Sequence, residues 1–117
     1  MSAWPPELDA VVAAGPYHIV LSENEFVRVL ETRIPPGHCV PVHTHRCCAS
    51  VYLISWSEAI RRDDKGNILL DTRGQEPPTL GTVGWQEPLG PHTFENVGTS
   101  DIHVITTEIK ATAAPDA

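Results

Sequence analysis

The segment 37–50, GHCVPVHTHRCCAS, holds the densest set of metal-binding side chains in this chain. His43 and His45 are two positions apart, and on a β-strand residues i and i+2 project from the same face. Both imidazoles can therefore reach one point, and imidazole is a common ligand for iron, zinc, nickel and copper. Two ligands alone make a weak site. A third histidine from another strand would complete a facial set and leave open positions for a substrate.

His92 is the strongest candidate for this third ligand, because it follows the turn sequence 88–91, PLGP, and is predicted to begin a strand. Cys47 would share the face of His45 if the strand continued regularly, and a thiolate there would favour zinc or reduced copper. It is therefore a further candidate ligand, although buried cysteine more often packs as a small apolar residue. His38 lies in a predicted Pro-Gly turn, where we expect it to be exposed.

The elements that must position these side chains are short strands separated by proline and glycine turns. The apolar and β-branched patterns predict strands at 17–21, 25–34, 40–46, 49–56, 58–62, 67–73, 82–86, 92–96 and 102–110. The pair around Asp64-Lys65-Gly66-Asn67 is typical of a β-hairpin. Arg61 and Arg62 precede two aspartates there, so we expect both at a solvated hairpin tip. Eight or more short strands with almost no helix indicate an all-β sandwich or barrel.

A length of 117 residues indicates one domain, with 1–16 as an N-terminal arm, 17–110 as the domain and 111–117 as a tail. The net charge of −7 argues against nucleic acid as a partner, because phosphate binding needs a basic surface. No apolar run approaches the ~20 residues of a transmembrane helix, and residues 1–15 lack the basic region and apolar core of a secretory signal. We therefore expect a cytoplasmic protein that does not bind membranes and whose three cysteines are free thiols.

Two stretches resemble the signature motifs of the cupin superfamily. Gly37, five residues and then His43-Thr44-His45 match the pattern G-x5-H-x-H. The stretch 88–96, PLGPHTFEN, resembles the second pattern, P-x-G-x2-H-x3-N, with one residue fewer between glycine and histidine. The similarity runs from about residue 17 to 110, and the stretch 92–110 looks like the end of small cupins grouped with a β-alanine degradation protein.

The resemblance implies a double-stranded β-helix, or jelly-roll barrel, with a divalent metal ion (Fe, Zn, Mn or Ni) held inside by His43, His45 and His92. The chain departs from the family pattern at Ala49 and Ser50, where cupins usually carry a glutamate ligand. A bound ion without this carboxylate would keep more positive charge, which favours an anionic substrate or a bound hydroxide. Jelly-roll cupins commonly dimerise through edge strands, so we also expect a homodimer.

These features predict a metal-dependent enzyme of the oxygenase, isomerase or lyase type that acts on a small polar or anionic organic molecule. The metal would act as a Lewis acid, or as the site where O2 and substrate meet. No general acid or base can be named from the sequence. Two alternatives remain open. One is a cupin that binds a metal or a small molecule as a sensor or carrier, and the other is a metal-free structural barrel.

Overall fold

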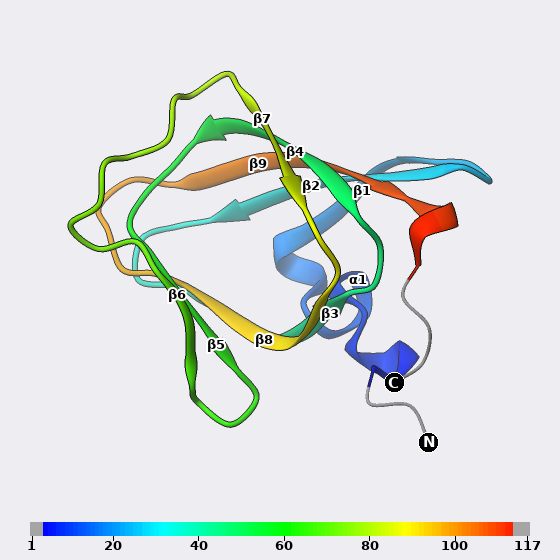
Figure 1. The fold of residues 1–117 in the computed structure, drawn as a ribbon, viewed down its shortest axis with the longest axis horizontal. Helices are drawn as coiled ribbons and strands as arrows, with labels where there is room; N and C mark the ends of the chain where they lie inside the picture. Colours follow the sequence, from blue (N-terminus) through cyan, green and yellow to red (C-terminus); the bar gives the residue numbers. More distant parts are fainter. Residues whose placement is uncertain (1–3, 114–117) are drawn as a thin grey trace.

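The structure is a computed structural model, and it describes residues 4–113. Within these residues, nine strands form two antiparallel sheets (Figure 1). They are β1 (His18–Glu23), β2 (Val27–Ile34), β3 (Cys39–His45), β4 (Ala49–Ser55), β5 (Ala59–Asp63), β6 (Ile68–Asp71), β7 (Val83–Gln86), β8 (Leu89–Asn96) and β9 (Ile102–Ile109). Each strand overlaps a segment that the sequence pattern assigned to a strand. The predicted all-β architecture is confirmed.

The two sheets enclose one apolar core. The five-stranded sheet has the order β1-β2-β9-β4-β7, and the four-stranded sheet has the order β3-β8-β5-β6. Strand β9 shows how the core forms, because its side chains are buried at every second position from Ile102 to Glu108. The buried apolar cluster draws on both sheets: Ala14, Ile34, Val40, Ala59, Phe94, Ile102 and Val104.

Strand β8 begins earlier than the sequence predicts, and this difference affects the site. It starts at Leu89, so Gly90 and Pro91 lie within the strand and not in a turn. The β3–β8 register shifts between Val40 and His43, and again between His43 and His45. Such irregularities accommodate a proline, which has no N–H to donate to the ladder. The tertiary pairing with β3 therefore overrides the local turn signal.

The segment before β1 packs against the barrel. It holds the 3-10 turns η1 (Pro6–Leu8) and η2 (Gly15–Tyr17) and the short helix α1 (Ala10–Ala13), which lies beside β3 (Figure 1). Asp9 caps α1 by accepting a hydrogen bond from the Val11 N–H at 3.2 Å, and it forms a parallel bridge with Thr44. Ala10 and Ala14 are fully buried. This segment therefore closes one end of the barrel next to the H-x-H sequence.

The chain after β9 continues into one short turn, η3 (Lys110–Thr112). Residues 114–117 of the predicted tail lie outside the described residues. Between residues 4 and 113, no helix has the length and apolar character that a membrane-spanning helix needs.

Candidate metal centre

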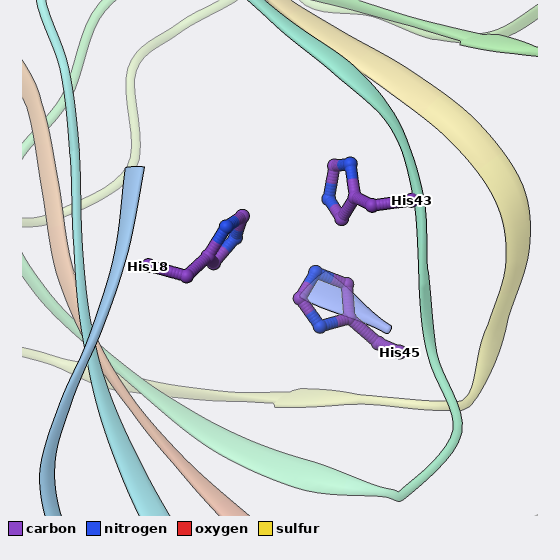
Figure 2. A group of neighbouring side chains, drawn as sticks. All are labelled: His18, His43 and His45. Atoms are coloured by element: carbon purple, nitrogen blue, oxygen red, sulfur yellow. The ribbon is translucent and has the colours of Figure 1, made fainter. Parts of the chain in front are cut away.

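Four histidine side chains meet inside the barrel. His18 comes from β1 of the five-stranded sheet, His43 and His45 from β3, and His92 from β8 of the four-stranded sheet. None of the four is more than 8% exposed. The ligand atoms of His18, His43 and His45 all lie within 4.8 Å of one another, and their rings gather around one space in Figure 2.

His92 lies directly beside this group. It is the register partner of His43 across the β3–β8 ladder, and the centroids of the two rings are 4.3 Å apart. The centroids of His45 and His92 are 5.5 Å apart. The structure therefore brings together His43, His45 and His92, the three histidines that the sequence selects. That these three are the ligand set stays a prediction, because His18 is an equally close fourth candidate, with ring centroids 5.0 Å from His43 and 5.4 Å from His45.

Hydrogen bonds to backbone carbonyls orient three of the four rings. A carbonyl oxygen can only accept, so Nδ1 carries the proton in each of these bonds. The other ring nitrogen, Nε2, then keeps its lone pair for a metal ion, as in other histidine metal sites. The bonds join His43 Nδ1 to Pro41 O (2.7 Å), His92 Nδ1 to Gly90 O (2.7 Å) and His18 Nδ1 to Ala14 O (3.1 Å).

Burial keeps these three rings neutral. It lowers the pKa of His18 to about 4, that of His43 to about 2 and that of His92 to about 3, because a charged imidazolium is poorly solvated inside the barrel. Neutral imidazole is the form that binds metals. The donor set, its tautomers and its charge therefore all suit a divalent transition-metal ion.

His45 has a carboxylate beside it in place of a carbonyl. Glu108 Oε2 lies 3.7 Å from His45 Nδ1, which is otherwise buried without a hydrogen-bond partner. Glu108 itself is 3% exposed, and its Oε1 accepts a hydrogen bond of 2.6 Å from Arg28 Nε. Burial would raise the pKa of Glu108, but the His45 ring and the Arg28 guanidinium outweigh it and hold that pKa below its ordinary value. An ionised carboxylate therefore stands on the Nδ1 side of His45.

Arg28 fixes this carboxylate from a second direction. Its Nη1 and Nη2 atoms donate to Asp9 at 3.0 and 2.9 Å, which is a two-bond contact with the residue that caps α1. Burial alone would lower the pKa of Arg28, but both carboxylates together raise it. The ion-pair network of Asp9, Arg28 and Glu108 thus connects the N-terminal segment to the Nδ1 side of His45.

Cys47 and His38 lie outside this group. Strand β3 ends at His45, and Cys47 follows in a half-buried bend, so the regular strand that would carry its thiol to the site is not formed. Burial and the nearby Glu108 raise the pKa of Cys47, which disfavours the thiolate that a metal would need. His38 is exposed, as predicted, and its Nδ1 lies 3.0 Å from the Tyr17 hydroxyl.

His18 is the residue that sequence reasoning missed. Its strand gives no alternation that would identify His18 as inward-facing, because Ile19, Val20 and Leu21 form a continuous apolar run and are exposed in the structure. The inward position of His18 depends on its bond to Ala14 and on packing across the two sheets. The one local signal is a histidine close after the Gly15-Pro16 turn, and this alone does not indicate a ligand.

A cavity of about 150 Å³ adjoins the four histidines, which form part of its wall. The rest of the wall is largely apolar, with Ile34, Val40, Leu53, Phe94 and Val104. Among the described residues that line the cavity, Arg61 is the only one with a permanent charge. The expectation that Arg61 lies at a solvated tip is wrong. The tip begins after Asp63, and alternation along β5 turns Arg61 inward while Arg62 pairs outside with Glu95 at 3.1 Å.

Comparisons with known proteins identify the fold. No family model matches the chain, and no curated protein matches it. Several solved structures do. A cupin domain from Bordetella pertussis is 22% identical with a TM-score of 0.61, over 79% of this chain and 90% of that one. An RmlC-like cupin from Methanocaldococcus jannaschii, with a double-stranded β-helix fold, is 12% identical with a TM-score of 0.55, over 79% and 77% of the two chains.

A third structure, from Klebsiella pneumoniae, contains a double-stranded β-helix domain and is 19% identical with a TM-score of 0.55, over 83% of this chain and 78% of that one. Identities at this level establish the fold alone. The closer resemblance to the β-alanine degradation protein group stays a prediction. The two facing antiparallel sheets and these structural matches agree on one architecture. The chain therefore has a double-stranded β-helix fold similar to that of these cupin domains.

Proposed function

We propose that this protein is a metal-dependent enzyme that converts a small polar or anionic organic molecule. The observation that carries the proposal is the convergence of four buried imidazoles beside a cavity. Burying polar ring nitrogens is unfavourable unless they gain a partner. A purely structural barrel would gain nothing from four of them at one point, whereas a bound metal ion would supply that partner.

The proposed ligand set is His43 and His45 together with the two histidines that flank them, His18 and His92. Nitrogen ligands of this kind suit iron, zinc and nickel, and cellular supply selects among them. Four imidazoles would leave positions open on an octahedral ion. The neighbouring cavity is where a substrate atom would approach those positions.

When bound, the metal would supply Lewis-acid chemistry by polarising an oxygen atom of the substrate. The chain itself orients the rings, through the Nδ1 bonds of His18, His43 and His92. Glu108 lies where it can accept a hydrogen bond from His45 Nδ1, and Arg28 holds that carboxylate in place. The largely apolar walls lower the local dielectric constant, which strengthens charge interactions inside the cavity.

A second function would use the same site without turnover, as a sensor or carrier of a metal or small molecule. One observation favours it. Among the described residues that line the cavity, none offers a carboxylate or a thiol as a general acid or base. Glu108, whose Oε2 lies 3.7 Å from His45 Nδ1, is already bound by Arg28.

Metal analysis of the purified protein tests the site itself. Wild-type protein and the His43→Ala and His38→Ala variants would be loaded with zinc, desalted and analysed by mass spectrometry of the elements. We expect stoichiometric zinc in wild type and in His38→Ala, whose histidine is exposed, and a large loss in His43→Ala. Absence of zinc from all three proteins would remove the basis for the site.

A turnover screen then separates the enzyme from the carrier. The metal-loaded protein would be incubated with small carboxylates, amino acids and thiols while oxygen uptake and product formation are followed. Conversion that depends on His43 supports the enzyme. Saturable binding without conversion of any compound supports the carrier.

A further inference from the structure

Arg61 is a cation that faces the interior without an acidic partner. It lies on β5 opposite Phe94 of β8, and its guanidinium carbon stands 5.0 Å from the centre of the Phe94 ring. Its Nε atom is buried and has no hydrogen-bond partner. Within residues 4–113, no carboxylate forms an ion pair with Arg61. Its neighbour Arg62 provides the contrast, since it pairs with Glu95 outside the barrel.

This arrangement is costly for the protein alone. Burial is the cause that lowers the pKa of Arg61, and no neighbouring acid offsets it. An unsatisfied charged N–H group inside a protein is more expensive than an unsatisfied neutral one. Native structures hold few such groups, and each calls for an explanation such as a missing ligand. The Phe94 ring contacts the face of the guanidinium and accepts no hydrogen bond from its N–H groups. These N–H groups point outward from the edge of the guanidinium and remain free to donate to a ligand.

The charge of the residues that line the cavity indicates that the ligand is an anion. Arg61 is the only permanently charged residue among the described lining residues, and His18, His43 and His92 are neutral. Glu108 lies on the Nδ1 side of His45 and is held by Arg28. The field of Arg61 therefore has no counter-ion in the cavity, and the apolar walls screen it weakly. A bound metal ion would add further positive charge.

The position and size of the cavity limit the ligand further. Arg61 also lines a second, more open surface pocket, and Val51, Leu53, Arg61 and Gln86 are common to both cavities. Arg61 thus stands where the surface pocket meets the interior. A cavity of about 150 Å³ is known to hold a molecule of the size of benzene. An organic anion with a short apolar body fits this space.

We propose that Arg61 binds the carboxylate of a small organic anion whose apolar body lies in the cavity between Arg61 and the histidines. A guanidinium and a carboxylate can form two parallel charge-assisted hydrogen bonds, one of which would satisfy the buried Nε–H of Arg61. The inference names the substrate class of the proposed enzyme and rests on that function for its reaction. The binding step involves Arg61 and not the metal, so it can be measured separately.

Isobutyrate and isobutyramide provide the test, because they share shape and differ in charge. Both would be titrated into metal-free and zinc-loaded protein, with binding followed through amide NMR shifts. We expect metal-free wild type to bind isobutyrate at least about tenfold more tightly than isobutyramide. Arg61→Gln should lose this preference. Arg62→Gln is the matched control on the same strand, and it should keep the preference.

A preference that persists in Arg61→Gln would overturn the proposal, as would wild-type protein that binds neither compound or binds both equally. Arg61→Lys serves as the second variant if Arg61→Gln does not fold. It keeps the charge but not the paired N–H groups, so its preference should be smaller than in wild type. Preference for isobutyrate in a protein that takes up no zinc would defeat the metal site and leave the Arg61 site standing. Normal zinc uptake without a preference for isobutyrate would support the metal site and overturn the Arg61 site.

Discussion

Ala49 and Glu108 are direct register partners on the neighbouring strands β4 and β9. Ala49 occupies one of the two positions where the resemblance to cupins predicts a glutamate ligand, and it is fully buried. A carboxylate beside His45 comes instead from the paired strand β9, where Glu108 Oε2 lies 3.7 Å from His45 Nδ1. Glu108 lies on the Nδ1 side of His45 and is bound to Arg28. It is therefore placed to support His45 as a metal ligand, and not to bind the metal in place of the missing glutamate. The predicted excess of positive charge at the site remains compatible with this arrangement.

Glu108→Gln is expected to weaken metal binding while leaving the fold intact. The amide keeps the shape of the side chain but loses the charge that would stabilise a metal-bound His45. Removal of such a supporting carboxylate typically lowers metal affinity about 10- to 100-fold. Competition with a zinc chelator would measure the change. Glu95→Gln is the control, since Glu95 pairs with Arg62 outside the barrel, and it should bind zinc as wild type does. Equal affinity in both variants would deny Glu108 any role.

The metal-free protein is expected to lose stability as the pH falls. The pKa values of His18, His43 and His92 are about 4, 2 and 3, against 6.5 in the unfolded chain. Below about pH 6.5 the unfolded chain takes up protons that the folded chain does not, so the free energy of unfolding decreases. The slope is about 1.4 kcal/mol per pH unit for each such histidine. Urea unfolding between about pH 7 and pH 5 measures it.

The variants His43→Gln and His38→Gln assign this pH dependence. His43→Gln should show a shallower slope, because it removes one of the buried rings. His38→Gln should keep the wild-type slope, because His38 is exposed. A stability that is constant or rises on acidification would contradict the burial of neutral histidines.

Asn96→Ala is expected to destabilise the protein strongly. Asn96 is fully buried, and its side chain donates to Ile34 O (2.9 Å) and Ser100 O (2.8 Å) and accepts from Gly98 N (3.0 Å). The substitution would leave these backbone groups without that partner, at a cost of about 2–4 kcal/mol in the free energy of unfolding. Urea unfolding would show it. The exposed Asn67→Ala should cost less than about 1 kcal/mol, and a similar loss in both would refute the argument.

A homodimer remains our expectation for the assembly. Strand β1 is an edge of the five-stranded sheet, and it leaves Ile19 50% and Leu21 52% exposed. Exposed apolar edge strands tend to pair with another chain. Light scattering should therefore give twice the chain mass of 12.8 kDa. Ile19→Lys should yield monomers, whereas Val12→Lys, which changes an exposed residue away from the edge, should not. A monomeric wild type would contradict the expectation.

The strands could be predicted because their signals are local. Alternation and proline or glycine turns placed each of them within a few residues, and the start of β8 was wrong only because pairing with β3 extends through Pro91. His43 and His92 were predictable for the same reason, since each lies in a short motif. Their direct pairing across the ladder could not be predicted, because it depends on shifts in register between two strands distant in sequence.

His18 and Arg61 could not be predicted because their environments are not local. His18 is buried by a segment that precedes it and by a sheet that it does not belong to. Arg61 sits in a run of charged residues that is typical of a solvated turn. Its inward direction follows from alternation along β5, but its burial depends on the Phe94 ring of the adjacent strand. The sequence therefore predicts that His43, His45 and His92 lie together, but not that His18 and Arg61 line the same cavity.

The origin of the four histidines in two different sheets has a mechanical consequence. An ion bound by His18 and by His43 would be a cross-link between the sheets, comparable to a disulfide through the core. Among the described strands, β1 pairs with β2 alone, so such a link would restrain β1 most. Zinc should therefore slow hydrogen exchange along β1 in wild type but not in His18→Gln. A catalytic metal ion would then also stabilise the edge strand β1, and its removal would increase the local opening of β1 before that of the other strands.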